Sequence, residues 1–335
     1  MLAYIVRRVA WMFVVLWGVM TITFFIARVI PADPVGAILG PNAPPEAIEQ
    51  ERARWGLDKP IHVQYITYLW GVLHGDMGVS IRTRRPVLED ILRFLPNTVE
   101  LAVVALVIGV TMGIALGIVS AVKNGHIIDH SGRIFAIIGL SMPAFWLGLL
   151  LLLLLYYKLG ILPGVGQIPY YVLRPPRATG FLILDCLIAG DFSALWSYLL
   201  HLIMPAMTLG WISTAAITRI TRSSMLEVFQ EEYINTARMK GLRESIVIMK
   251  HAFKNAVIPT ITIIGIRIAS LLEGAVLTET VFAWPGLGRY ATWSFLALDF
   301  NAVVGVTVFI AFLYSFSNLI VDLLYAYLNP LIRYE

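Results

Sequence analysis

The chain alternates between long apolar stretches and shorter polar segments. Six of the apolar stretches are long enough to cross a bilayer, which takes about 20 helical residues. They cover residues 9–27, 101–122, 134–157, 198–217, 257–282 and 302–328. Because backbone polar groups in lipid must find their hydrogen bonds within the chain, such stretches are expected to be helices. The pattern predicts an all-α polytopic membrane protein with six transmembrane helices in one domain, residues 1–335.

Two of the polar segments between these stretches are expected to be outer loops with sequence patterns of their own. Residues 30–100 are expected to form an organised outer loop, with a charged helix from Pro44 to Arg54 and an interfacial, aromatic-rich helix at 61–73. This loop fits either a structural cap over the outer opening or a docking surface for a substrate carrier. Residues 158–197 form a second outer loop whose apolar part, 181–189, is too short to cross.

The composition agrees with a membrane protein. Hydrophobic residues make up 59% of the chain and charged residues 14%, whereas a soluble domain carries about 25% charged residues. The formal net charge of +4 is small and spread over several loops, so a nucleic-acid partner is not expected. Cys186 is the single cysteine, which excludes an internal disulfide or a thiolate metal cluster. The first apolar run is longer than a signal-peptide core and is expected to stay as a span.

The distribution of Lys and Arg predicts the orientation. If the N-terminus is cytoplasmic, the inner segments carry twelve basic residues, and the second and third outer loops carry four. The first outer loop carries eight more, but loops above about 60 residues escape this rule. Both termini are therefore expected in the cytoplasm, which makes residues 219–255 a cytoplasmic loop.

Sequence motifs of enzymes are missing. The chain has no phosphate-binding GxxxxGK[ST], no HExxH and no GxSxG, and no nucleophile–base pair is apparent. Gly286–Ala291 begins like a dinucleotide fingerprint but lacks its final glycine, and it is interpreted as a turn. His126 and His130 flank Asp129 at helical spacing, but the rest of a metal ligand set is absent, so a solvated turn is expected. We expect no enzyme activity and no metal site.

Two features lie within the predicted spans. Gly109, Gly113 and Gly117 are spaced four residues apart, a pattern that lets helix backbones pack closely in lipid. Arg267 and Glu273 are charged residues in the fifth span, where a charge costs about 3 kcal/mol unless it faces a cavity or a partner. They are candidates for lining the translocation pathway or for a contact with another subunit, and a structural pair is the alternative.

The cytoplasmic segment 219–255 is the most organised polar part of the chain. Residues 232–240 favour a short helix that ends at Gly241, with the small Ala237 at its centre. A solvated loop is the simple alternative. A loop of this length normally has a function, and the pattern suits a short helix gripped by a groove in a partner.

At this point the residues resemble a known family. The cytoplasmic segment resembles the EAA loop of ABC importer permeases over Thr221–Val228, Glu232–Leu242 and His251–Pro259. Within these permeases, the resemblance is strongest to the dipeptide/oligopeptide group of the peptide/nickel class. Further signatures follow in family order over essentially the whole chain: residues 30–35, 56–60, 75–80, 141–143, 282–289 and 321–325. Asn235 and Met239 differ from the commoner Arg and Ala of the motif.

The resemblance implies a type I importer permease in the bacterial inner membrane. It implies a heterodimer with a second permease, two ATPase subunits that bind ATP and magnesium, and an extracytoplasmic binding protein. The chain itself would need no cofactor. The positions carried over for coupling to the ATPase are Glu232, Tyr233, Ala237 and Gly241.

The resemblance leaves the substrate open. The extended second outer loop is more similar to the dipeptide branch, so short peptides are favoured over nickel, metallophores or glutathione. A stand-alone secondary transporter is a more distant alternative.

Overall fold

The computed structural model describes residues 2–29, 44–54 and 56–328. Within them the regular elements are helices, and the β contact is an isolated antiparallel bridge between Val79 and Pro86. The predicted all-α fold is confirmed. The chain divides into two compact units, one formed by Met1–Pro96 with Pro285–Glu335 and the other by Asn97–Trp284.

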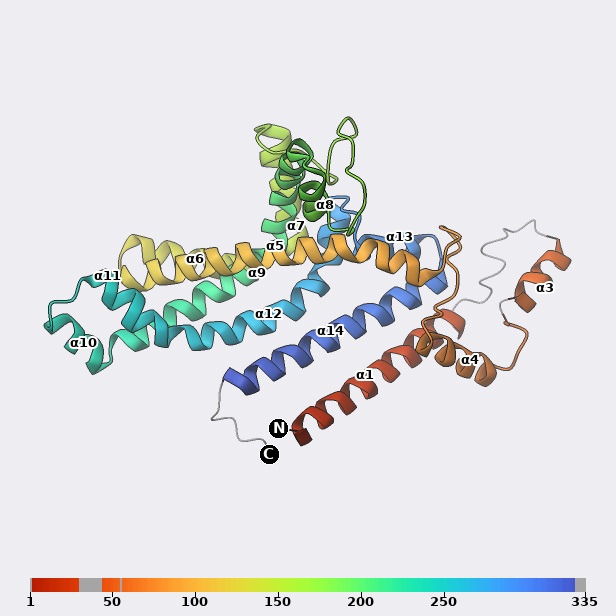
Figure 1. Ribbon diagram of the computed structural model, residues 1–335, viewed down its shortest axis with the longest axis horizontal. Helices are drawn as coiled ribbons and strands as arrows, with labels where there is room; N and C mark the ends of the chain where they lie inside the picture. The colour runs from red at the N-terminus through yellow and green to blue at the C-terminus, as the bar shows by residue number, and fades with distance from the viewer. Residues whose placement is uncertain (1, 30–43, 55, 329–335) are drawn as a thin grey trace. The chain divides into compact units, whose positions relative to one another are not determined.

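The first unit is organised by two long helices that lie side by side, α1 (Leu2–Val29) and α14 (Phe300–Leu328) (Figure 1). Against α1 packs the shorter α4 (Ile61–Leu73), and against α14 packs α13 (Leu287–Leu296). Two clusters of buried side chains hold the unit together: Met20, Val304 and Val308 in one, and Val87, Ile91, Leu287, Tyr290, Ala302 and Val306 in the other.

The second unit is built around α9 (Phe192–Phe229). Its surrounding elements are α5 (Val87–Val122), α6 (Ile127–Ser141), α7 (Ala144–Leu151), α8 (Leu182–Ala189) and α12 (Lys254–Val281), with the π-helical segments η1 (Leu152–Lys158) and η2 (Val247–Phe253). The apolar window of α9 is 72% buried within the chain, whereas that of α1 is only 6% buried. Thus α9 is enclosed by its own chain, and α1 offers most of its surface to lipid or to another subunit.

The glycines spaced four residues apart on α5 allow a neighbouring helix to pack closely, as the sequence predicts. A Cβ atom on Gly113 would lie 2.7 Å from the Cβ of Ile217, and one on Gly117 would lie 2.6 Å from the Cβ of Thr221. In the other direction, a Cβ on Gly210 of α9 would lie 2.5 Å from the Ala105 carbonyl oxygen. Side chains at these positions would force the helices apart, so the prediction of close packing is confirmed and its partner is α9.

The count of spans agrees with the sequence, but one span is broken. Among the described residues, five helices are long and apolar enough to cross a membrane, and a bent pair of helices gives up to six. The pair is α6 followed by α7 with η1, and the chain bends by 110° between its two parts. A single straight helix over 134–157 is therefore the wrong expectation. Pro143 has no N–H to donate and forces Met142 into an extended conformation, with φ −85° and ψ 126°.

Most of the predicted loop helices are present. The charged helix is α3 (Pro45–Arg54), and the interfacial one is α4 over the predicted residues. The short apolar piece of the second loop is α8. One interpretation was wrong: Gly286 is not in a simple turn but is the N-cap residue of the ten-residue helix α13.

Buried carboxylates fix the second loop. Glu100 on α5 accepts hydrogen bonds from the backbone N–H groups of Leu182, at 3.0 Å, and Ile183, at 2.8 Å, and from the Tyr198 hydroxyl at 2.8 Å. It thereby satisfies N–H groups that the start of α8 would otherwise leave without partners. Asp185 accepts four further bonds, all from donors in residues 178–180.

Candidate functional site

The polar segment that follows α9 folds into the short helix α10 (Glu232–Met239). An acidic residue in its first turn, Glu232, and a basic one in its last turn, Arg238, both suit the helix dipole. The helix ends where Gly241 takes the left-handed conformation, φ +73°, and donates its N–H to the Arg238 carbonyl at 2.9 Å. The predicted short helix with its terminal glycine is confirmed.

One face of α10 is anchored to the ends of the long helices. Ile234 and Ala237, three residues apart and thus on one face, are both buried. They belong to a single apolar cluster with residues from α5, α9, η2 and α12: Ala121, Met225, Val247, Ala252 and Ala256. A displacement of α10 would therefore be transmitted directly to three predicted spans.

The four residues predicted for coupling fall into two groups. Glu232 and Tyr233 are exposed, and the Tyr233 hydroxyl accepts a hydrogen bond from Asn255 Nδ2 at 2.7 Å. Ala237 is only 6% exposed and faces the core of its own chain. Gly241 is exposed and would have open space around a Cβ, so its requirement is one of backbone conformation. Whether these residues couple to a partner stays a prediction.

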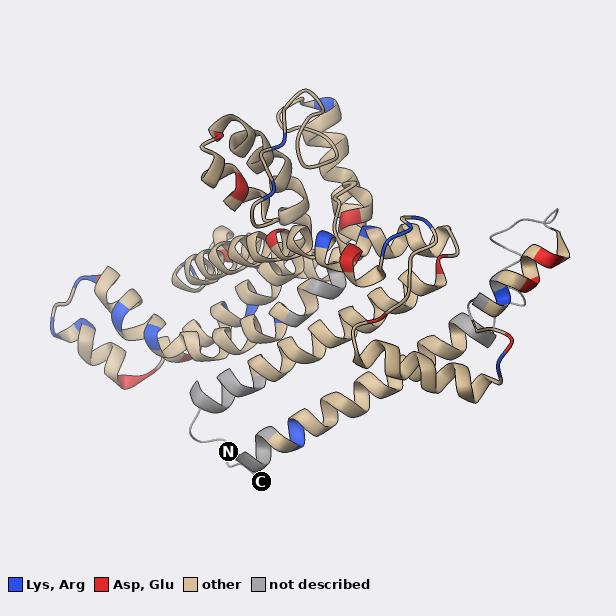
Figure 2. Cartoon of the chain, turned by 45° about the vertical axis from the view of Figure 1, so that its right-hand side comes forward, with Lys and Arg blue, Asp and Glu red and all other residues tan. Residues whose placement is uncertain are grey.

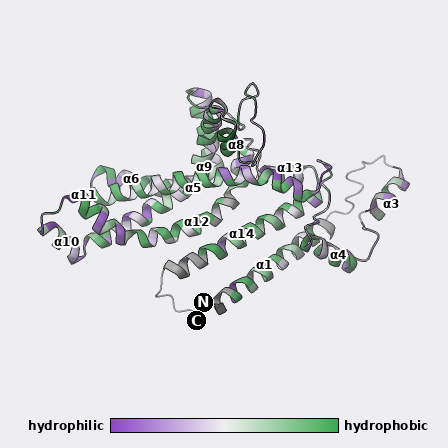
Figure 3. Cartoon of the chain, viewed as in Figure 1, coloured by the Kyte–Doolittle hydropathy of each residue, from purple (hydrophilic) through white to green (hydrophobic). Residues whose placement is uncertain are grey.

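The same segment also carries exposed apolar side chains. Met239 is 81% exposed, and four more large side chains between α10 and η2 are exposed by more than a third: Tyr233, Leu242, Ile246 and Met249. They lie in the part of the second unit where charged and hydrophilic residues gather around α10 and α11 (Glu244–Ile246) (Figures 2 and 3). Exposed apolar patches rimmed by polar residues are typical of protein contact sites, which makes this segment a candidate for one.

The turn after α10 is held from both sides. Arg238 pairs with Glu244 at 2.8 Å, and its guanidinium lies 5.7 Å from the centre of the Phe229 ring. The following segment, η2, is π-helical, a geometry that occurs frequently at functional sites. The segment from α10 to η2, residues 232–253, thus forms an ordered platform rather than a solvated loop.

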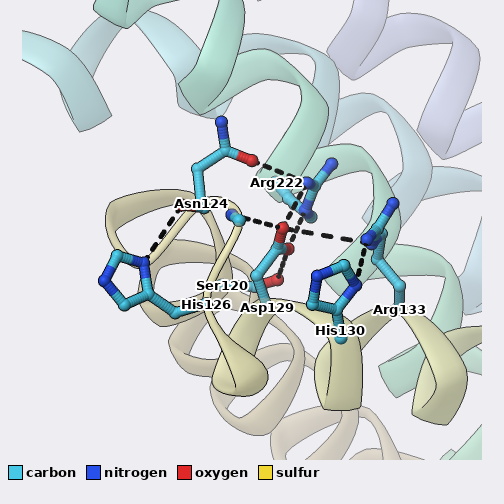
Figure 4. A network of polar contacts seen from close by, with 8 residues as sticks. Ser120, Asn124, His126, Asp129, His130, Arg133 and Arg222 are labelled. Atoms are coloured by element: carbon cyan, nitrogen blue, oxygen red, sulfur yellow. Dashed lines mark hydrogen bonds and ion pairs between the residues drawn. The ribbon is translucent and has the colours of Figure 1, made fainter.

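A buried ion pair supports the same end of the unit (Figure 4). Asp129, at the start of α6, is 1% exposed and accepts two bonds from Arg222 on α9, at 2.5 and 2.8 Å. Ser120 on α5 donates to the same carboxylate at 2.7 Å. The network joins α5, α6 and α9. Sequence reasoning missed it, although Arg222 lies within the stretch that resembles the EAA loop.

The histidines beside Asp129 are occupied elsewhere. His130 contacts Arg133, and His126 Nδ1 lies 3.2 Å from the carbonyl oxygen of Asn124 (Figure 4). Both histidines are exposed, as expected, but they lie at the start of helix α6 rather than in a turn, with His126 as its N-cap residue. Among the described residues, no three His, Cys, Asp or Glu side chains are grouped as a metal site requires.

The two candidate pathway residues lie on α12. Arg267 is half-buried, and its Nε atom is buried without a hydrogen-bond partner among the residues described. The charge that acts on it is the like charge of Arg219 on α9. The side chain of Glu273 lies outside the described residues. A pathway role for both therefore remains a prediction.

Comparison with known proteins places the chain in a family. The profile described as "Binding-protein-dependent transport system inner membrane component" matches residues 113–334, and the N-terminal profile of the same systems matches residues 1–102. The chain belongs to this family. The family gives the platform around α10 a context, since its members are the membrane components of multi-subunit transport systems.

Relatives match the chain over its full length. The probable D,D-dipeptide transport system permease protein DdpB of Escherichia coli K12 is 46% identical over 97% of this chain and 96% of its own. The dipeptide transport system permease protein DppB of the same strain is 41% identical over the whole of both chains. The glutathione transport system permease protein GsiC of Pectobacterium atrosepticum is 38% identical, again over both whole chains.

Proposed function

We propose that this chain is the permease subunit of an ATP-driven importer that moves short peptides into the cytoplasm. The observation that carries the proposal is the full-length similarity to permeases of dipeptide transport systems, at 41–46% identity. The described residues add a helical membrane domain and an ordered polar platform. The chain itself performs no chemistry.

The platform around α10 is the proposed contact with an ATPase subunit. Its exposed apolar residues, Met239 above all, would enter a groove of that subunit. Its buried residues Ile234 and Ala237 would pass the motion on to α5, α9 and α12 through their shared cluster. ATP and Mg²⁺ would bind to two ATPase subunits, and this chain would hold no cofactor.

The remaining partners follow from the family. A second permease subunit would complete the translocation pathway, with Arg267 and Glu273 as candidate lining residues, and an extracytoplasmic binding protein would deliver the peptide. The chain would lie in the bacterial inner membrane with both termini in the cytoplasm. The excess of Lys and Arg on the inner segments supports this orientation.

The substrate alternatives lie within the same family. Glutathione, itself a short peptide, is supported by the similarity to GsiC. Nickel or a metallophore would keep the same architecture and coupling helix. A secondary transporter that works alone would have no use for the platform around α10.

Uptake in a strain lacking this chain, and in its complemented twin, tests the proposal. Labelled L-alanyl-L-alanine, glutathione and ⁶³Ni²⁺ are offered side by side, with and without an ATPase-dead partner subunit. We expect dipeptide uptake that depends on both the chain and the ATPase. If the chain restores only nickel or glutathione uptake, that compound and not the dipeptide is the substrate. If uptake does not depend on the ATPase but is abolished by an ionophore, the chain is not part of an ATP-driven importer.

A further inference from the structure

The first unit contains a polar cavity that the transport mechanism above does not use. Its volume is about 320 Å³, at the lower end of the range of small-molecule pockets, about 300–1,000 Å³. The cavity lies between α4, the turn that precedes α4 and the segment that follows it. Its polar lining residues are Lys59, Gln64, Thr67, Tyr68, Asp76 and Asn301.

The cavity has groups of opposite charge in its lining. Asp76 is oriented by the backbone, because its Oδ1 accepts the N–H of Gly78 at 2.9 Å. Lys59 is held through its carbonyl oxygen, which accepts a hydrogen bond from Gln64 Nε2 at 2.8 Å. Within the described part of the chain, neither charge forms an ion pair. A ligand with both an anionic and a cationic end would match this lining.

A third polar group also lacks a partner. The hydroxyl of Tyr68 is buried, and no described residue hydrogen-bonds to it. Thr23 lies close enough to act on the Tyr68 hydroxyl, but it donates its own proton to the Val19 carbonyl at 2.7 Å. Burial raises the pKa of Tyr68 to about 12, so the hydroxyl keeps its proton at physiological pH and can donate it in a hydrogen bond. Buried polar groups in proteins are nearly always paired, which makes this hydroxyl a candidate ligand contact.

An apolar recess lies next to the polar cavity. Its volume is about 40 Å³, and it shares three lining residues with the cavity: Tyr68, Met77 and Asn301. The rest of its wall is apolar: Phe24, Val72, Phe300, Val304 and Gly305. The recess has room for a small apolar side chain, such as a methyl group.

We propose that this cavity binds a short peptide as a zwitterion. Lys59 takes the terminal carboxylate, Asp76 takes the terminal ammonium, and the Tyr68 hydroxyl donates to a peptide oxygen. The recess holds one side chain. The inference rests on the proposed function, since it places a peptide site on the first loop, where a peptide would be held before it reaches the spans.

The test is equilibrium dialysis of ¹⁴C-labelled L-alanyl-L-alanine against the chain purified with its partner subunits, without nucleotide and without the binding protein. N-acetyl-alanyl-alanine lacks the ammonium, and alanyl-alanine amide lacks the carboxylate. We expect each analogue to bind at least about tenfold more weakly than the free dipeptide. This comparison uses only the wild-type chain and does not depend on the folding of any variant.

Variants then assign each end of the peptide. Lys59→Gln is expected to weaken the free dipeptide about tenfold but to leave the amide as it was. Asp76→Asn is expected to weaken the free dipeptide but to leave the N-acetyl form unchanged, and Tyr68→Phe is expected to weaken all three. His62→Gln is the matched control, because His62 is exposed on α4, the helix that carries Tyr68, and does not line the cavity.

Absence of binding at millimolar dipeptide, or equal binding of the free and blocked forms, would overturn the site. Uptake measured in parallel separates this failure from that of the proposed function. If ATP-dependent peptide uptake is seen but the isolated complex binds no dipeptide, the proposed site is wrong and the proposed function stands. If the complex binds the zwitterion but the chain imports only nickel, the site stands and the peptide-importer function is wrong.

Discussion

Arg222 and Asp129, 93 positions apart, form a two-point ion pair that joins the starting turn of α6 to the end of α9. Arg222 Nε lies 2.5 Å from Asp129 Oδ1, and Nη2 lies 2.8 Å from Oδ2. The pair lies at the same end of the second unit as the cluster that anchors α10, because Ala121 of that cluster follows Ser120 of the ion-pair network. Two independent sets of contacts, one polar and one apolar, therefore tie this platform to the long helices.

Loss of the arginine is predicted to destabilise this end of the protein. Arg222→Gln would remove the main counter-charge of the buried Asp129 carboxylate and leave only the more distant Arg133. Breaking a buried pair in this way costs about 3–5 kcal/mol. We expect a clear fall in the melting temperature of the purified complex and a loss of uptake. Arg133→Gln is the control, since Arg133 is half-exposed and lies 3.9 Å from the same carboxylate. Equal effects of the two substitutions would contradict a special role for Arg222.

Gly241→Val is predicted to impair coupling through the backbone. A Cβ atom at Gly241 would meet nothing within 4 Å, so a clash at that atom is not the obstacle. The left-handed φ of +73° is the obstacle, and it costs a residue with a Cβ about 1–2 kcal/mol. We expect the turn after α10 to change and ATP-dependent uptake to fall while the spans stay inserted.

Gly241→Asn is the matched variant, because asparagine tolerates the left-handed region better than a β-branched residue. It should keep most of the uptake that Gly241→Val loses. If the valine variant transports at the full rate, the terminal turn of α10 has no part in coupling.

Ala237 and Met239 are predicted to act in different ways although they are two residues apart. Ala237→Leu would overpack the cluster under α10, which costs about 1–3 kcal/mol, and should lower the stability of the purified chain. Met239→Ala removes an exposed side chain and should leave stability unchanged while it weakens co-purification of the ATPase. A Met239→Ala variant that retains the ATPase fully would place the contact elsewhere on the platform.

Arg267→Gln tests the pathway assignment. Arg267 lies near the middle of α12, and its buried Nε has no hydrogen-bond partner among the described residues. Such an arginine is expensive to keep in a span, which favours a functional role. We expect uptake to fall about tenfold, with Arg267→Lys retaining part of it, and Glu273→Ala is the companion variant. Lys254→Gln, at the exposed start of the same helix, is the control. Unchanged transport in both pathway variants would assign the two residues to structure.

Local patterns were sufficient to predict the helices and the close packing along α5. Apolar runs, glycine spacing and a terminal glycine each act on neighbouring residues, so α4 and α10 could be expected directly. The break at Pro143 also has a local cause, the proline itself. Because the apolar run continues across Pro143, hydropathy alone does not indicate the bend. In the same way, Gly286 could cap a helix or form a turn, and only the packing of α13 on α14 decides between them.

Long-range side-chain relationships could not be predicted. Arg222 meets Asp129 only because α9 lies beside α6, and the sequence places neither helix. Ala237 illustrates a subtler case: its small size is consistent both with a tight partner contact and with burial in its own chain, and the structure shows it 6% exposed within this chain. The sequence of the short helix does not say whether its apolar face is covered by its own chain or by a partner.

Acidification is predicted to loosen the second loop through Asp185. Burial by itself would raise the pKa of Asp185, but the bonds from residues 178–180 outweigh burial and hold the pKa below its usual value. A depressed pKa in the folded state means that the ionised carboxylate stabilises the loop above the unfolded pKa of about 3.9. That stabilisation is lost as the pH falls through the lower, folded pKa. Limited proteolysis of residues 158–197 should therefore be slow at pH 7 and faster near pH 3, and Asp185→Asn should be cleaved quickly at both. A variant as resistant as the wild type at pH 7 would show that these bonds do not hold the loop.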